Sequence, residues 1–133
     1  MSEIARRPPS PELRTIDKLR AVLNDMVAAG EFEAAVLMSA DSLPIAACPP
    51  EQPGDQLGML VSFLRRVCIE AEKQVDLAQI EEVTMRDASH TQLVYRRLRP
   101  DAHSPTLTVV VPAGRPYRRA MNRALRRLKR WVD

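Results

Sequence analysis

The feature that most constrains the fold of this chain is the stretch from Gln56 to Leu77, which carries two sets of apolar residues at helical spacing. The first set makes one continuous stripe along a helix and consists of Leu57, Leu60, Val61, Leu64, Cys68, Ala71 and Val75. Met59, Phe63 and Val67 form a second set, which lies well round the helix because each residue advances by about 100°. A helix that packs on a sheet by one face needs only one stripe.

The second set admits two interpretations. Leaving these side chains in water would forgo about 1.5–3 kcal/mol for each of them. Either another chain covers them, or the helix is buried more deeply within its own chain. The spacing alone favours neither interpretation.

The remaining elements follow from apolar runs and turn signals. After a loose polar arm at residues 1–9, Ser10 and Pro11 have the character of an N-cap and a first-turn proline, and Gly30 ends this first helix. Pro116 begins a last helix, whose apolar stripe includes Trp131. Strands are expected over residues 33–39, 43–47, 80–86, 91–98 and 106–112.

The character of the strands predicts how they are arranged. Residues 33–39 and the run Val109 to Val111 are apolar on both faces, which is typical of interior strands. Pro44 cannot donate to a strand ladder, so its strand belongs at an edge. Interior strands need cover on both faces, and three amphipathic helices supply it. We therefore expect one domain over residues 10–133, of the α/β class, with three layers (α/β/α) and a five-stranded antiparallel sheet.

Charge and cysteine content narrow the class of protein. The formal net charge is only +3, but residues 115–133 hold eight basic residues and one acidic residue. Cys48 and Cys68 form neither a CxxC motif nor a disulfide framework. No apolar run approaches the roughly 20 residues of a transmembrane segment, and no signal-peptide pattern is present. We expect a cytoplasmic protein without a transmembrane segment.

The sequence carries no pattern typical of catalysis. Its four glycines are too scattered to form a phosphate-binding loop. His90 and His103 fall in predicted turns with no cysteine nearby, whereas a metal site needs three or four convergent ligands. Ser39 and Asp41 have no histidine near them in the sequence. We expect no catalytic site, no cofactor, no metal and no small-molecule substrate.

The element order and one segment resemble the roadblock family, which is named for dynein light chains and includes bacterial and archaeal GTPase regulators. The segment runs from Ala35 to Ala46 and contains an apolar strand, a Ser-x-Asp turn and a Leu-Pro-Ile-Ala strand. Family members usually have glycine where this chain has Ser42. A serine at positive φ costs about 1–2 kcal/mol, so this turn is either strained or of another type. The similarity covers about Leu13 to Trp131.

The resemblance implies a homodimer in which the third strand pairs with its twin and the second helices lie side by side. It also implies a non-catalytic regulatory or scaffold module for a Ras-like small GTPase. The residues expected to contact the second copy or the partner are Met59, Phe63, Val67, Arg65, Arg66, Glu70, Val83 and Met85. Arg65 and Arg66 are of interest because a GTPase-activating partner can donate an arginine to the transferring phosphate. Alternatively, they are solvated or paired with Glu70 and Glu72.

The basic last helix offers a rival function, binding of nucleic acid or of an anionic surface. The residues that would make this contact are Arg119, Arg123, Arg126 and Arg130. No aromatic residues are interleaved with these arginines, which argues against recognition of bases but leaves a nonspecific electrostatic contact open. Such a face is more often solvated, or it docks on an acidic partner.

Overall fold

The computed structural model describes residues 11–50, 54–101 and 103–132, and only the backbone of residues 11–13 and 54–57. Its elements in chain order are α2 (Pro11–Gly30), β1 (Ala34–Met38), β2 (Pro44–Cys48), α3 (Gly54–Gln74), β3 (Glu82–Arg86), β4 (Gln92–Arg97), β5 (Thr106–Val111) and α4 (Arg118–Leu128). This is the order expected from the sequence. The predicted arm at residues 1–9, the N-cap Ser10 and the side chain of Leu57 lie outside the described part.

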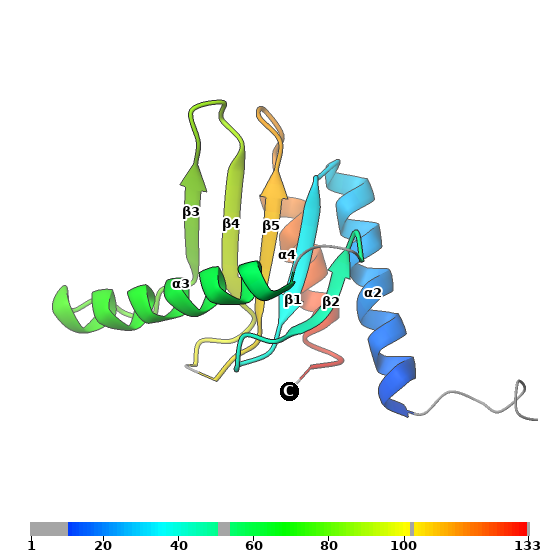
Figure 1. Cartoon of the computed structure of the whole chain (residues 1–133), viewed down its shortest axis with the longest axis horizontal. Coiled ribbons are helices and arrows are strands. Elements are labelled where there is room, and N and C mark those ends of the chain that lie inside the picture. Colours follow the sequence, from blue (N-terminus) through cyan, green and yellow to red (C-terminus); the bar gives the residue numbers. More distant parts are fainter. Residues whose placement is uncertain (1–10, 51–53, 102, 133) are drawn as a thin grey trace, which may run out of the picture.

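The strands form one antiparallel sheet in the order β2-β1-β5-β4-β3 (Figure 1). The two strands predicted to be interior, β1 and β5, lie side by side near its middle. Pro44 is on an edge strand, as its missing N–H requires. The other edge is β3, which pairs only with β4 within the described residues. The predicted α/β class and antiparallel sheet are confirmed.

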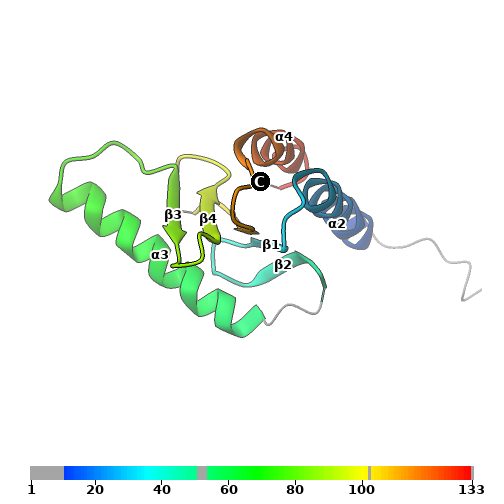
Figure 2. The ribbon, with the colours of Figure 1, turned by 90° about the horizontal axis from the view of Figure 1, so that it is seen from above.

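Helices cover both faces of the sheet, as expected. Figure 2 shows α2 and α4 on one face and α3 on the other. α3 runs across the strands rather than along them, and its C-terminal end extends past β3 (Figures 1 and 2). Within the described residues, no strand lies beyond β3 to support this overhanging end of α3.

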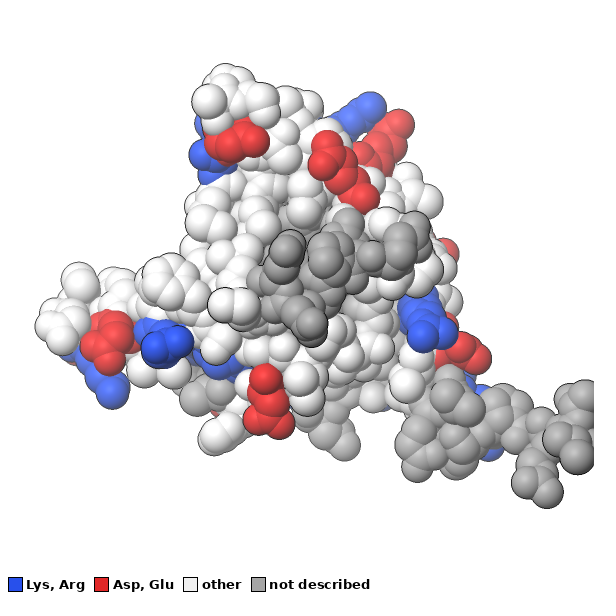
Figure 3. Space-filling model, viewed as in Figure 1, with Lys and Arg blue, Asp and Glu red and all other residues white. Residues whose placement is uncertain are grey.

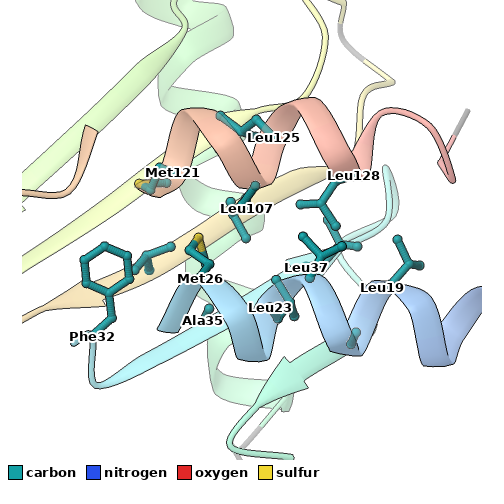
Figure 4. Packing of buried hydrophobic residues seen from close by; sticks show 14 of the residues in the cluster. Leu19, Leu23, Met26, Phe32, Ala35, Leu37, Leu107, Met121, Leu125 and Leu128 are labelled. Atoms are coloured by element: carbon teal, nitrogen blue, oxygen red, sulfur yellow. The ribbon is translucent and has the colours of Figure 1, made fainter. Parts of the chain in front are cut away.

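Each face has its own hydrophobic cluster. Between α2, α4 and the sheet, one cluster contains Leu23 and Met26 of α2, Leu125 and Leu128 of α4, and Leu37 of β1 (Figure 4). The cluster under α3 is smaller and consists of Val36, Met38, Val61, Leu64, Cys68 and Tyr95. The first stripe of α3 therefore faces the sheet, as its spacing predicts.

The turn between β1 and β2 places Ser42, which stands where the resemblance leads us to expect glycine, in a left-handed backbone conformation. Ser42 has a φ of 62°, and its N–H donates to the Ser39 carbonyl oxygen at 2.9 Å. The turn lies directly against α3, because a Cβ added at Gly58 would come within 2.9 Å of the Ser42 carbonyl oxygen. Gly58 inside a helix is explained by this close approach.

Two helix ends differ from the prediction. α3 ends at Gln74 rather than at Leu77, because the chain turns at Asp76, which has a φ of 53°. Val75, expected to face the sheet, is 64% exposed on the overhang. α4 ends at Leu128, so Trp131 lies beyond the helix, with the Lys18 ammonium 3.9 Å from its ring centre.

Candidate functional site

The outer face of α3 carries the second apolar set, here called the α3 stripe: Met59, Phe63 and Val67. Their exposed fractions are 77%, 56% and 42%. The described part of the chain therefore does not cover them, and within these residues α3 is not the more deeply buried helix of the other interpretation. In the space-filling view of this face, charged side chains lie mainly toward the margins (Figure 3). Among the described side chains of α3, the large apolar ones that are exposed are those of the α3 stripe.

Two hollows border the α3 stripe. One, of about 430 Å³, is lined by Phe63, Arg66, Val67, Glu70, Ala71 and Gln74. The other, of about 500 Å³, lies between α3 and the β1–β2 turn and is lined by Asp41, Ser42, Leu43, Pro44, Gly58, Met59, Ser62 and Arg66. Arg66 is common to both hollows, and its side chain is exposed. The apolar surface thus continues from α3 to Leu43, which is 64% exposed.

Arg65 does not share this surface, contrary to the expectation from the sequence. Its side chain is buried, with Nη1 donating to the Ser104 carbonyl oxygen at 2.9 Å and Nη2 to that of Ser39 at 3.4 Å. The reason is helical position, since residue 65 follows Val61 by four and so lies on the sheet side. That spacing was the available signal, but charge suggested an outward side chain.

A second buried basic residue, Arg97 of β4, pairs with α3. Its Nη2 lies 3.2 Å from Oε2 of Glu72, and its side chain is only 4% exposed. The same carboxylate oxygen accepts the Ile80 N–H at 2.7 Å. Glu72 is therefore the partner of Arg97 and Ile80 rather than of Arg65 or Arg66. Sequence reasoning missed this pair because its members are far apart in the chain.

Burial under α3 also affects two titratable groups. Desolvation raises the pKa of the Cys68 thiol, although Arg97 acts in the opposite direction. Desolvation likewise raises the pKa of the Tyr95 hydroxyl. Both groups are therefore held in their neutral forms at neutral pH, which suits a structural interior better than a reactive site.

The open edge of the sheet lies on the same side of the molecule as the α3 stripe. Val83 of β3 packs against the cluster under α3, and Met85, two residues on, is 40% exposed on the same face. An unpaired edge presents backbone N–H and C=O groups that can pair with another strand. The structure thus places Val83 and Met85 on the side of the sheet that α3 covers.

The basic residues of the C-terminal region lie on the opposite face of the sheet, on and just after α4. Arg119, Arg123, Arg126 and Arg130 are all exposed. Their neighbours are partly neutralised, since Arg127 lies 2.9 Å from Asp25 and Arg118 lies 3.9 Å from Glu82. The two surfaces predicted from the sequence are therefore separate and cannot form one site within a single chain.

Other candidate chemistry is not assembled. His90 and His103 are exposed in separate turns, and residues 11–50, 54–101 and 103–132 contain no group of three His, Cys, Asp or Glu that could hold a metal ion. Within the same residues, no helix has both the length and the apolar character needed to cross a membrane.

Comparison with solved structures finds several of the same fold. The gliding protein MglB from Thermus thermophilus aligns with a TM-score of 0.75 and 17% identity, covering 89% of this chain and 90% of that one. A structure described as MglB with a tetrameric arrangement aligns at 0.73 and 18%, over 95% and 93% of the two chains. A Roadblock/LC7 domain from Streptomyces avermitilis aligns at 0.73 and 18%, over 84% and 95%. No protein-family model and no curated protein matches the sequence.

Proposed function

We propose, on the premise that this chain has the roadblock fold, that it is a dimeric regulatory or scaffold module for a Ras-like small GTPase. The α3 stripe and the edge strand β3 would bind a second copy, and the paired helices would present Arg66 and the neighbouring hollows to the GTPase. No catalytic site of its own is required. The observation that carries the proposal is the exposure of the α3 stripe beside an open sheet edge.

The energetics favour a combined interface over the stripe alone. Fully burying a side chain of this kind contributes about 1.5–3 kcal/mol, and the three in the stripe are already partly buried. Association costs about 4–15 kcal/mol in lost translational and rotational freedom. The stripe by itself therefore gives little surplus. Pairing of two β3 strands adds backbone hydrogen bonds and buries Met85, which supports a dimer built from both elements.

The overhang of α3 supports the same arrangement. Val75 and Leu77 are 64% and 50% exposed beyond β3, where the chain's own sheet has ended. In a twofold dimer through β3, the second sheet would begin at this position. The overhanging residues would then pack on the second copy, and a self-complementary contact of this kind is typical of twofold dimers.

Arg66 replaces Arg65 as the proposed GTPase-contacting arginine. Arg65 is committed to backbone carbonyls of its own chain, whereas Arg66 is exposed between the two hollows. Glu70 lines one of these hollows and is also exposed, so the surface offers charges of both signs beside apolar side chains. Such a mixed surface is typical of interfaces that form and dissociate.

The proposal is tested by light scattering and by pull-down with a Ras-like GTPase encoded near this chain. The parent should scatter as a particle of twice its 15.0 kDa mass, and Phe63→Asp should reduce it to a monomer. Arg66→Glu should keep the dimer and weaken GTPase capture. Arg119→Glu, the same charge reversal on the other face of the sheet, is the matched control. If folded Phe63→Asp and Arg66→Glu behave as the parent does, the proposed surface is wrong.

The exposed arginines Arg119, Arg123, Arg126 and Arg130 support a second candidate, contact with nucleic acid or another anionic surface. Binding of this kind is driven by counterion release, so its affinity falls steeply as salt increases. A titration with duplex DNA at low and at physiological salt tests it. Absence of binding even at low salt would eliminate this candidate.

A further inference from the structure

A cavity of about 280 Å³ lies between α4, the end of β4 and the segment that precedes β3. It is separate from the α3 stripe, because α4 covers the opposite face of the sheet (Figure 2). It is lined by four basic residues that do not form ion pairs with the described side chains of α3: Arg96, Arg99, Arg126 and Lys129. Arg97 also belongs to the lining, but its guanidinium is paired with Glu72 under α3.

The charge of this cavity is not balanced by its own walls. Glu81 is the acidic residue of the lining. Glu82 stands nearby, with Oε1 3.9 Å from Arg96 Nε, but its Oε2 already accepts the Tyr117 hydroxyl at 2.9 Å and lies 3.9 Å from Arg118. Arg126 and Lys129 are exposed, and neither forms an ion pair with any residue in the described parts of the chain.

Two of the guanidinium groups are held in place by neutral acceptors. Arg96 Nη1 donates to the side-chain amide oxygen of Asn122, and Arg99 Nη2 donates to the Lys129 carbonyl oxygen at 3.3 Å. These bonds fix the side chains without neutralising them, and each guanidinium keeps further N–H donors. The Arg99 bond also satisfies one carbonyl oxygen at the C-terminal end of α4. Unpaired carbonyl oxygens at a helix C-terminus carry partial negative charge and would disfavour an anion.

We infer that this cavity binds a small phosphate-bearing anion. Guanidinium groups present a planar fork that matches phosphate oxygens, and charge-assisted bonds of this kind are the strong ones. The volume is just below the range of about 300–1,000 Å³ that is typical of drug-sized ligands. It therefore suits a phosphate or diphosphate group rather than a nucleic-acid duplex or a partner helix.

The test is a titration of the full chain with inorganic pyrophosphate, followed by amide chemical shifts at physiological ionic strength. Saturable shifts are expected at residues lining the cavity, including Arg99 and Asn122. The double variant Arg126→Gln/Lys129→Gln should bind at least about tenfold more weakly, since each lost charged hydrogen bond is of that order. Both side chains are exposed, so the variant should fold, and its unfolding midpoint is the check.

The matched control is Arg119→Gln/Arg123→Gln, which removes the same amount of charge from α4 but no residue of the cavity lining. Its affinity should change by less than about twofold, because exposed charges at a distance are screened. An equal loss in both double variants, or no saturable shift in the parent, would overturn the inference. Competition between pyrophosphate and vesicles containing an anionic phospholipid would identify a lipid headgroup as the source of the phosphate. Absence of competition would identify a free phosphate compound.

Discussion

The Arg65 guanidinium donates a 2.9 Å hydrogen bond to the carbonyl oxygen of Ser104, 39 residues further along the chain. This bond ties α3 to the connection between β4 and β5. It also explains why two adjacent arginines on one helix have different roles, since Arg65 is used within the chain and Arg66 remains exposed.

Arg65→Ala should therefore destabilise the fold, and Arg66→Ala should not. Removing Arg65 leaves a buried carbonyl without its charged donor, which costs about 2–3 kcal/mol in the free energy of unfolding. Arg66→Ala should change it by no more than about 0.5 kcal/mol. Urea denaturation of both variants measures the difference. Equal effects of the two substitutions would contradict the assignment of Arg65 to the interior.

Ionisation of the Cys68 thiol at alkaline pH should lower the free energy of unfolding. Burial raises the pKa of this thiol above the value of 9.0 for an unburied cysteine. The folded state holds the proton more tightly than the unfolded chain, so the thiol's contribution is complete below about pH 9 and is lost as the pH rises further. The difference in unfolding free energy between the parent and Cys68→Ala should be constant near neutral pH and should narrow above about pH 9.

This comparison contains its own control, because Tyr95, Cys48 and every other titrating group are present in both proteins. The contributions of groups that do not interact with Cys68 cancel in the difference. Ionised Cys68 also raises the pKa of Tyr95, so the gap is compared below about pH 10, where Tyr95 is neutral in both proteins. A gap that stays constant or widens above about pH 9 would show that the thiol is not desolvated in the folded state.

Two equally exposed apolar residues should differ in their effect on dimerisation. Val75 and Leu43 are both 64% exposed, but Val75 lies on the overhang beyond β3 and Leu43 lies by the β1–β2 turn. If the second copy binds at β3, Val75→Ser should weaken the dimer by roughly 1 kcal/mol, and Leu43→Ser should leave it unchanged. Sedimentation equilibrium gives both dissociation constants. The reverse order would place the dimer interface at the other edge of the sheet.

Ser42→Gly should stabilise the protein. Ser42 has a φ of 62°, a conformation that costs about 1–2 kcal/mol for a residue with a side chain. Glycine removes that cost but gives up about 0.5–1 kcal/mol of unfolded-state restriction. The expected net gain is about 0.5–1 kcal/mol in the free energy of unfolding, measured by urea denaturation. A loss of stability would show that Ser42 makes a contribution that outweighs its backbone strain.

The arrangement of the sheet could be predicted from the sequence because strand parity and proline report on burial directly. The apolar run at 34–38 and the valines of β5 indicated interior strands, and Pro44 indicated an edge. The spacing also placed Phe63 on a second side of α3, but it left open whether that side is exposed or buried, and the structure shows Phe63 to be exposed. These patterns involve residues that are close together in the chain, so they can be recognised in a single sequence.

Contacts between distant segments were not predictable in the same way. The Glu72–Arg97 pair and the cavity between β4 and α4 depend on which elements the sheet order and the helix packing bring together. Arg65 was misjudged because charge outweighed helical position, and Val75 because the spacing gives no sign of where the sheet beneath α3 ends. Except for Arg65, whose helical spacing already indicated burial, each of these features required the register of one element against its neighbours.

The fixed points along α3 have a consequence for what this helix displays. Apolar contact alone would let a helix lying across strands roll about its own axis at small cost. Two directional contacts oppose this rotation: the hydrogen bond from Arg65 to the Ser104 carbonyl oxygen and the ion pair between Glu72 and Arg97. They lie about two helical turns apart, and a rotation of α3 by the angle of one residue would break both. They therefore fix the rotation of α3 about its own axis, and this rotation determines which row of side chains is exposed to a binding partner.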